Sequence, residues 1–149
     1  GVFHDIGKVL IGDLALLEKN RQFTDQDMER MEDHVLLGFA FLVGAGFLFS
    51  AHVMVRHHRF KKKNPYPRYL PSLPPHWVVR EDGFTYHARL LALADSFDAL
   101  MTRNNDRNGN EPLSPEEKRR IYLDENGDQA ELIASLMSAG ILDFDTTPA

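Results

Sequence analysis

The chain has 149 residues, enough for one domain with a hydrophobic core and too few to assume two. Hydrophobic residues make up 43% of it and charged residues 26%, which is ordinary for a soluble globular protein. The formal net charge of −5 argues against a protein that mainly coats nucleic acid. The absence of cysteine excludes disulfides and thiolate metal sites, and a reducing cytoplasm suits this composition.

The sequence shows no signal peptide and no initiator methionine, and its most distinctive motif begins already at His4. We therefore interpret it as a fragment or a processed chain from which an N-terminal segment is missing. We expect residues 1–149 to form a single domain in the cytoplasm.

The first predicted elements are helices. His4 and Asp5 are expected on the last turn of a helix that Gly7 ends, so that an imidazole and a carboxylate point at the same place. Thr24 followed by Asp27 resembles a capping box, which opens the next helix.

The segment from Val35 to Val55 carries no charged residue and is long enough to span a membrane. A basic cluster that would suit a cytoplasmic flank follows it, consisting of Arg56, Arg59, Lys61, Lys62 and Lys63. Against a membrane span, glycines interrupt the segment and His52 lies inside it. Two short buried helices joined near Gly44–Gly46 explain the same apolar residues, and we favour this interpretation.

The middle of the chain is predicted to contain helix, loop and helix. Ser50–His58 continues as a helix that carries a histidine doublet at its end. Prolines recur from Asn64 to Pro75, which predicts a proline-rich loop over about residues 60–84. Thr85–Thr102 is predicted to be a helix, because its apolar residues form a stripe with a period of 3.6.

The C-terminal part also reads as helix. Ser114 is a good N-cap, with Pro115 at the first helical position and Glu117 at the third. A last helix is expected over about Asp128–Met137 and should end at Gly140. Since no segment alternates with a period of two for long enough to form a sheet, the predicted fold class is all-α.

Histidine and aspartate residues recur along these elements in a way that indicates a metal site. The candidate ligands are His4, Asp5, His34, His57, His58 and Asp95. Imidazole suits iron, manganese and zinc, and an aspartate can bridge two metals through its two oxygens. The set exceeds what one tetrahedral zinc needs and fits two adjacent metals that share Asp5. Any single histidine is better explained as a core or surface residue than as a ligand, and we assign His76 and His87 to that class.

Asp95 and Asp98 lie three residues apart on the predicted helix, so both face the same side. Buried carboxylates are costly unless they are paired or bind a metal. A cap or an ion pair with Arg89 or Arg103 would explain them structurally. We favour Asp95 as a metal ligand and Asp98 as a residue that contacts either the substrate or a metal-ligating side chain.

Positive charge surrounds these candidates in a chain that is negative overall. The ammonium of Lys8 could neutralise a phosphoryl oxygen, although a lysine near a helix C-terminus is also common. The basic run from Arg56 to Lys63 is either a solvated surface or an attractor for an anionic substrate such as a phosphate ester or nucleotide.

The chain resembles the HD superfamily of metal-dependent phosphohydrolases, and within it the HD-GYP branch, whose members hydrolyse cyclic dinucleotides. The resemblance rests on HDIGK at 4–8, HVLLG at 34–38, RHH at 56–58, Tyr66-Pro67, ARLLALADSFDALMT at 88–102 and LSPEE at 113–117. These segments follow the family's order over nearly the whole chain. The resemblance implies a helical bundle from which one or more N-terminal helices are missing.

The family also implies roles for individual residues and two divalent transition metals, such as iron or manganese. One metal is held by the residues that match His4, Asp5 and Asp95. A second is held by those that match His34, His57 and His58, with the Asp5 equivalent bridging the two. The Lys8 position contacts the substrate phosphate, and the positions of Tyr66, Asp98 and Arg107 lie around the bound dinucleotide.

The chain departs from the family pattern at several places. The upstream histidine of the family has no counterpart, which leaves the first metal under-coordinated. Arg59 stands where the family has glutamate, which puts a third metal in doubt. The family's Asp-Gly reads Lys62-Lys63, and its Gly-Tyr-Pro reads Pro65-Tyr66-Pro67. Its Arg-Pro-Tyr-Arg becomes residues 104–107, which keep only the last cation.

The leading hypothesis is a metal-dependent phosphodiesterase for a cyclic dinucleotide in bacterial signalling. The partner it implies is an anionic nucleotide, without a nucleic acid polymer or a membrane, and an upstream sensor domain or an oligomer would be compatible. Two alternatives stay open. One is a degenerate HD module that binds a nucleotide or a protein without turnover, and the other is an HD hydrolase of mononucleotides.

Overall fold

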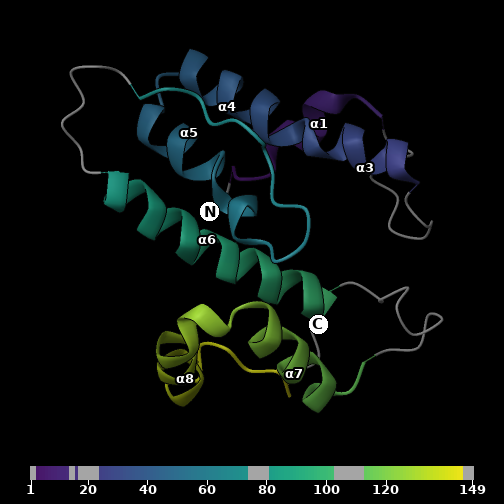
Figure 1. The fold of residues 1–149 in the computed structure, drawn as a ribbon, viewed down its shortest axis with the longest axis vertical. Coiled ribbons are helices and arrows are strands. Elements are labelled where there is room, and N and C mark those ends of the chain that lie inside the picture. Colours follow the sequence, from purple (N-terminus) through teal and green to yellow (C-terminus); the bar gives the residue numbers. More distant parts are fainter. Residues whose placement is uncertain (1–2, 14–15, 17–23, 74–80, 103–112, 146–149) are drawn as a thin grey trace. The chain divides into compact units, whose positions relative to one another are not determined.

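The computed structural model describes residues 3–13, 16, 24–73, 81–102 and 113–145. Within these ranges the regular elements are helices, and no strand occurs, which confirms the predicted all-α class. The chain divides into two compact units, Gly1–Ala92 and Leu93–Ala149. The long helix α6 (Glu81–Thr102) contributes to both units (Figure 1).

The first helix, α1 (Ile6–Ile11), begins after the His-Asp pair, and Asp5 is its N-cap. The expectation that Gly7 ends a helix is therefore wrong, because Gly7 lies in the first turn of α1. A β-carbon built on Gly7 would lie 1.7 Å from the backbone oxygen of His34, so glycine serves close helix packing here. Gly12, in the left-handed region at φ 72°, ends the helix.

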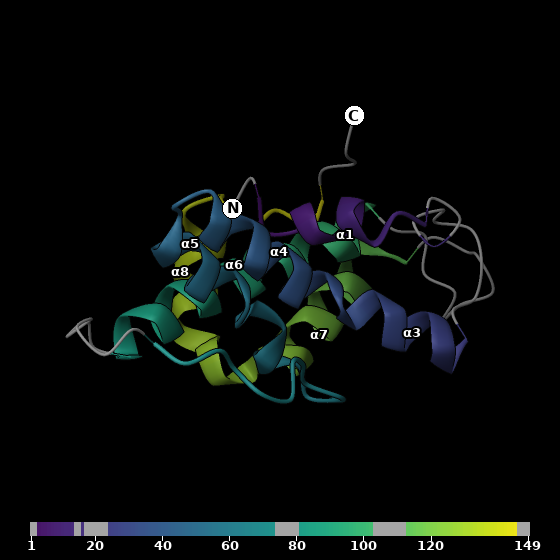
Figure 2. The same cartoon turned by 90° about the horizontal axis from the view of Figure 1, so that it is seen from above.

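Two consecutive helices lie beside α1 in the first unit. Thr24 and Asp27 form the predicted capping box at the start of α3 (Asp25–Glu32). The chain continues almost at once into α4 (His34–Gly44), whose first residue is a candidate ligand. Gly38 of α4 faces Gly7, so two glycines let α1 pack closely on α4, and both views show these helices adjacent (Figures 1 and 2).

The apolar segment from Val35 to Val55 forms two helices, α4 and α5 (Leu48–Met54), joined at Gly44–Gly46 as predicted. Gly46 adopts φ 84°, which allows the reversal between them. One face of the pair is buried around Leu42, Ala51 and Met54. The opposite face is exposed, so the expectation of buried helices holds for one face only. Among the described residues, no helix is both long and apolar enough to cross a bilayer.

After α5, the chain forms a short 3₁₀-helix, η1 (His57–Phe60), and then an irregular loop from residue 61 to 73. This loop coincides with the described part of the predicted proline-rich segment, and residues 74–80 lie outside the described ranges. Tyr66 of the loop packs against Val35 and Val55, which fixes the loop to α4 and α5. The helix α6 begins at Glu81, a few residues earlier than predicted.

The second unit contains the C-terminal turns of α6, α7 (Pro115–Glu125), the 3₁₀-helix η3 (Gly127–Gln129) and α8 (Ala130–Ser138). The capping box of Ser114 and Glu117 opens α7 as predicted, and Gly140 follows α8 at φ 68°. The core residues of this unit are Leu93, Leu100, Tyr122, Ile133, Leu142 and Phe144. The Tyr122 hydroxyl donates to the Leu93 carbonyl at 3.1 Å, which ties α7 to α6.

Candidate metal centre

Asp5 presents its two carboxylate oxygens to different groups. Oδ1 lies 3.4 Å from Nε2 of His34, and Oδ2 lies 3.4 Å from Nε2 of His4. The ammonium of Lys8, one turn into α1, donates to Oδ2 at 2.5 Å. The two carboxylate oxygens of Asp5 therefore face different histidines.

His34 begins α4 and is fully buried. Its Nδ1 makes a hydrogen bond to the backbone carbonyl of Met31. Because a carbonyl can only accept, Nδ1 carries the proton, and the neutral ring keeps its lone pair on Nε2, the atom nearest Asp5. A backbone acceptor of this kind is the usual means by which proteins orient a metal-binding histidine.

His57 is held in the same way. It is the first residue of η1, it is almost fully buried, and its Nδ1 donates to the carbonyl of Met54 at the end of α5. The lone pair of the neutral ring is again on Nε2. The turn after α5 therefore aims this nitrogen at the site by a local hydrogen bond to the preceding helix.

His58 lies directly beside His57, with ring centroids 3.8 Å apart. The ring of Tyr66 lies 4.5 Å from the His58 centroid and 6.1 Å from that of His34. Tyr66 is only 5% exposed, so its ring forms a wall of the histidine group. This environment fixes the plane of the His58 imidazole.

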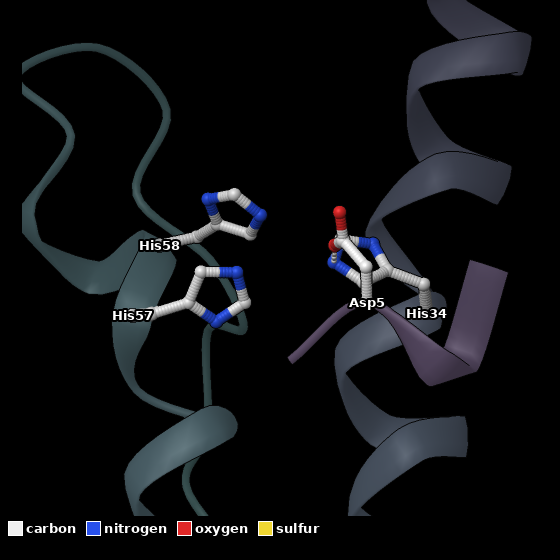
Figure 3. A group of neighbouring side chains, drawn as sticks. All are labelled: Asp5, His34, His57 and His58. Carbon is white, nitrogen blue, oxygen red and sulfur yellow. Dashed lines mark ion pairs between the residues drawn. The ribbon is translucent and has the colours of Figure 1, made fainter. Parts of the chain in front are cut away.

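These residues form one group of potential ligands. One ligand atom from each of Asp5, His34, His57 and His58 lies within 4.8 Å of all the others. Figure 3 shows the two imidazoles of the doublet facing Asp5 and His34, which come from separate elements. Oδ1 of Asp5 and Nε2 of His34 are buried and make no hydrogen bond. Such atoms are costly in an interior, and a cation would satisfy both of them.

Burial favours the neutral forms of His34 and His58, as metal binding requires. Burial lowers the pKa of His34 to about 4, although the hydrogen bond to Met31 opposes this shift. Burial also lowers the pKa of His58 strongly, and the neighbouring His57 and Lys61 act in the same direction. A neutral imidazole and an ionised carboxylate form a donor set that suits divalent transition metals.

The other predicted site residues are distributed over both units. His4 belongs to the first unit, and its ring lies 5.5 Å from that of His57. Asp95 and Asp98 lie on α6 within the second unit, where Asp95 is half-buried and Asp98 is exposed. Arg107 lies outside the described residues. The roles predicted for these aspartates and for Arg107 stay predictions.

The basic run divides into residues with different surroundings. Arg56 is buried and donates to the His52 carbonyl at 2.7 Å, so it does not belong to an exposed basic surface. Arg59 donates to the carbonyls of Pro67 and Arg68. Lys62 and Lys63 are exposed.

Sequence reasoning missed two contributors to the site, the carbonyls of Met31 and Met54. Each lies three residues before the histidine that it orients. That spacing is the only signal in the sequence, and it reflects a local turn rather than the methionine side chain. The close approach of Gly7 to His34 was also missed, because it depends on the packing of two helices.

Comparison with known proteins places this geometry in context. Residues 1–100 match the HD domain family. A probable cyclic di-GMP phosphodiesterase of Vibrio cholerae is 35% identical over 133 residues, which cover 83% of this chain and 27% of that protein. The cyclic di-GMP phosphodiesterase response regulator RpfG of Xanthomonas campestris is 34% identical over 102 residues, covering 66% of this chain and 24% of that protein.

A cyclic di-GMP phosphodiesterase of Thermotoga maritima is 32% identical over 108 residues, which cover 70% of this chain and 27% of that protein. The chain thus spans about a quarter of the length of these relatives. No solved structure matches the chain at a comparable level of significance.

Proposed function

The chain belongs to the HD domain family, and from this premise we propose that it is a metal-dependent phosphodiesterase that hydrolyses a cyclic dinucleotide of the cyclic di-GMP type. One observation carries the proposal. Asp5 and three buried histidines converge, and Oδ1 of Asp5 and Nε2 of His34 lie buried without a hydrogen bond. The names of the relatives support the substrate class.

The proposed ligands divide between two metals, iron or manganese. His34, His57 and His58 would hold one, His4 and Asp95 the other, and Asp5 would contribute an oxygen to each. The distinct surroundings of Oδ1 and Oδ2 support this bridging role. When bound, such metals lower the pKa of a coordinated water and offset charge on a phosphoryl group.

The side chains have their own tasks in the hydrolysis. The oxygen of water bonds to phosphorus as water loses a proton, and the bond from phosphorus to the ribose oxygen breaks. The ribose oxygen takes up a proton and leaves as a hydroxyl group, so the ring of the dinucleotide opens. We assign to Lys8, whose ammonium donates to Oδ2 of Asp5, the task of offsetting the negative charge that grows on the phosphoryl oxygens. The hydrogen bonds of His34 and His57 to backbone carbonyls hold their rings in place, so that little reorganisation is needed.

Exposed cations would draw the substrate toward the site. Lys62 and Lys63 follow η1 directly and lie in solvent, close in sequence to the histidine doublet. They would attract an anion through a field that salt screens. We therefore propose that substrate affinity falls as ionic strength rises. Asp98 and Arg107 are retained as proposed substrate contacts from the resemblance.

The test is hydrolysis of cyclic di-GMP by the purified chain loaded with Mn²⁺ or Fe²⁺, followed by separation of the linear and mononucleotide products. His57→Ala should lower the rate at least about 100-fold, since it removes a proposed ligand and since even changes to the residues that orient ligands cost about 10- to 100-fold. His87→Ala is the matched control, because His87 is an exposed histidine of α6.

Three outcomes separate the hypotheses. Turnover that depends on His57 but not on His87 supports the proposal. Metal and nucleotide binding without turnover would favour the degenerate binding module. Hydrolysis of mononucleotides in preference to cyclic di-GMP would favour the third hypothesis and overturn the proposed substrate.

A further inference from the structure

Arg59 occupies an unexpected position beside the metal centre. It directly follows the histidine doublet, yet its side chain turns away to the loop that returns past the site. Its guanidinium donates to the carbonyl of Pro67 at 3.0 Å and to that of Arg68 at 3.2 Å. Both hydrogen bonds come from one nitrogen of the guanidinium, Nη1. Arg59 thereby joins η1 to a part of the loop eight and nine residues further along the chain.

The loop segment that Arg59 contacts includes Tyr66, whose ring packs against the histidine group. Tyr66 precedes Pro67, and its ring packs 4.5 Å from the His58 ring. A second cation contacts Tyr66 directly: the ammonium of Lys61 lies 4.6 Å from the Tyr66 ring centre and donates to its hydroxyl at 3.3 Å. A cation over an aromatic face is attractive, and more so where water is partly excluded.

We propose that Arg59 is a positioning residue for the metal centre: by holding the carbonyls of Pro67 and Arg68, it keeps the Tyr66 ring against His58 and so sets the orientation of that ligand. The inference rests on the proposed function, because it takes His58 as a ligand. The proposal explains why a cation, Arg59, follows the histidine doublet in this chain.

The direction in which metal affinity changes when Arg59 is replaced distinguishes a positioning role from a purely electrostatic one. A cation near a metal site repels the metal, so removing its charge should tighten metal binding if charge alone mattered. Removing a group that orients a ligand should weaken binding instead, by about 10-fold where such contacts have been studied. The two accounts of Arg59 therefore predict opposite changes in affinity.

The test compares Co²⁺ binding to the wild-type chain, Arg59→Met and Arg59→Lys, followed through the visible absorption of the bound ion. We expect Arg59→Met to raise the dissociation constant about 10-fold and to change the absorption spectrum, which reports ligand geometry. Arg59→Lys should recover part of the affinity, because the single nitrogen of an ammonium can also donate to both carbonyls. Arg68→Met is the control, since it removes a cation from the same loop but leaves the backbone acceptor in place.

Two further measurements test whether Arg59 acts on metal binding through Tyr66 and the loop. Arg59→Met combined with Tyr66→Leu should weaken binding no more than Tyr66→Leu alone, because the proposed influence of Arg59 passes through Tyr66. Amide hydrogen exchange of the metal-free chain should be faster over residues 61–70 in Arg59→Met than in Arg68→Met.

The outcomes are distinguishable from those of the proposed function. Unchanged or tighter Co²⁺ binding in Arg59→Met, with normal binding by the wild-type chain, would overturn the positioning role and leave the metal centre intact. A wild-type chain that binds no Co²⁺ would overturn both. Faster exchange over the loop with weaker binding and an altered spectrum would establish the role.

Discussion

Gly7 lies so close to His34 that a β-carbon on Gly7 would stand 1.7 Å from the His34 backbone oxygen. Asp5 lies two residues before Gly7, and the imidazole belongs to His34, whose backbone Gly7 approaches. The distance of 3.4 Å between Oδ1 of Asp5 and Nε2 of His34 therefore depends on how closely α1 packs on α4. The absence of a side chain at Gly7 is thus a condition for assembling the centre.

Gly7→Ala should destabilise the chain and spread the ligands apart. Alanine normally favours a helix interior by about 1 kcal/mol over glycine. Here the clash is with backbone, which cannot move aside as a flexible side chain can, and we expect a net loss of about 2 kcal/mol or more. Denaturant unfolding measures the change.

Gly44→Ala is the matched control for Gly7→Ala. Gly44 also lies in a helix, but a β-carbon there would meet nothing within 4 Å. This variant should be neutral or slightly more stable than wild type. Equal effects of the two substitutions would contradict the packing role of Gly7.

The stability of the metal-free chain should fall as pH decreases from about 6.5 to 4. The pKa of His34 is lowered to about 4 in the folded chain, whereas the unfolded chain binds the proton near pH 6.5. In this interval the unfolded state binds more protons, so protonation favours unfolding, and the loss approaches about 3 kcal/mol for His34 alone. The lowered pKa of His58 acts in the same direction.

Denaturant midpoints measured in the presence of a chelator between pH 4 and 7 check this expectation. His34→Gln removes one titrating group and should flatten the dependence, whereas His87→Ala should leave it as in wild type. A wild-type curve that is parallel to that of His34→Gln would contradict the assignment of the effect to His34.

Lys8→Met should lower the turnover number about 100-fold while leaving the metal content near that of wild type. The ammonium of Lys8 donates to Oδ2 of Asp5, and in the proposed function it offsets the charge that develops on the phosphoryl oxygens. Loss of one such stabilising group typically costs about 100- to 1000-fold in rate.

Steady-state kinetics with metal analysis of the same sample measures this effect, and Lys62→Met, which removes an exposed lysine, is the control. Lys62→Met should raise KM at low salt with little change in kcat. If Lys8→Met instead lost its metals, the role of Lys8 would be to hold Asp5 rather than to act on the substrate.

Local signals in the sequence were sufficient to predict most of the helices. The capping boxes at Thr24 and Ser114 each depend on contacts three residues apart, and both occur as predicted. Gly46 and Gly140 adopt left-handed conformations at the predicted helix ends. Such features can be predicted because their cause lies within a single turn of chain.

Features that depend on contacts between elements could not be predicted in this way. Gly7 does not end a helix, contrary to expectation, because a glycine that permits close packing and one that ends a helix look alike in a sequence. The buried Arg56 and the contacts of Arg59 were equally hidden. Asp5 and the three buried histidines come from separate segments and converge in the fold. Their spacing in the sequence does not by itself specify this convergence.

Metal content per chain tests the central claim most directly. Elemental analysis of the anaerobically purified chain after loading with Mn²⁺ or Fe²⁺ should find about two transition metals per wild-type chain if the proposed ligand sets are correct. Asp5→Asn keeps the shape of the side chain but removes its charge and one oxygen, and it should lose most of this metal. A wild-type chain that stays free of metal after loading, or an Asp5→Asn chain that binds as much as wild type, would contradict the account.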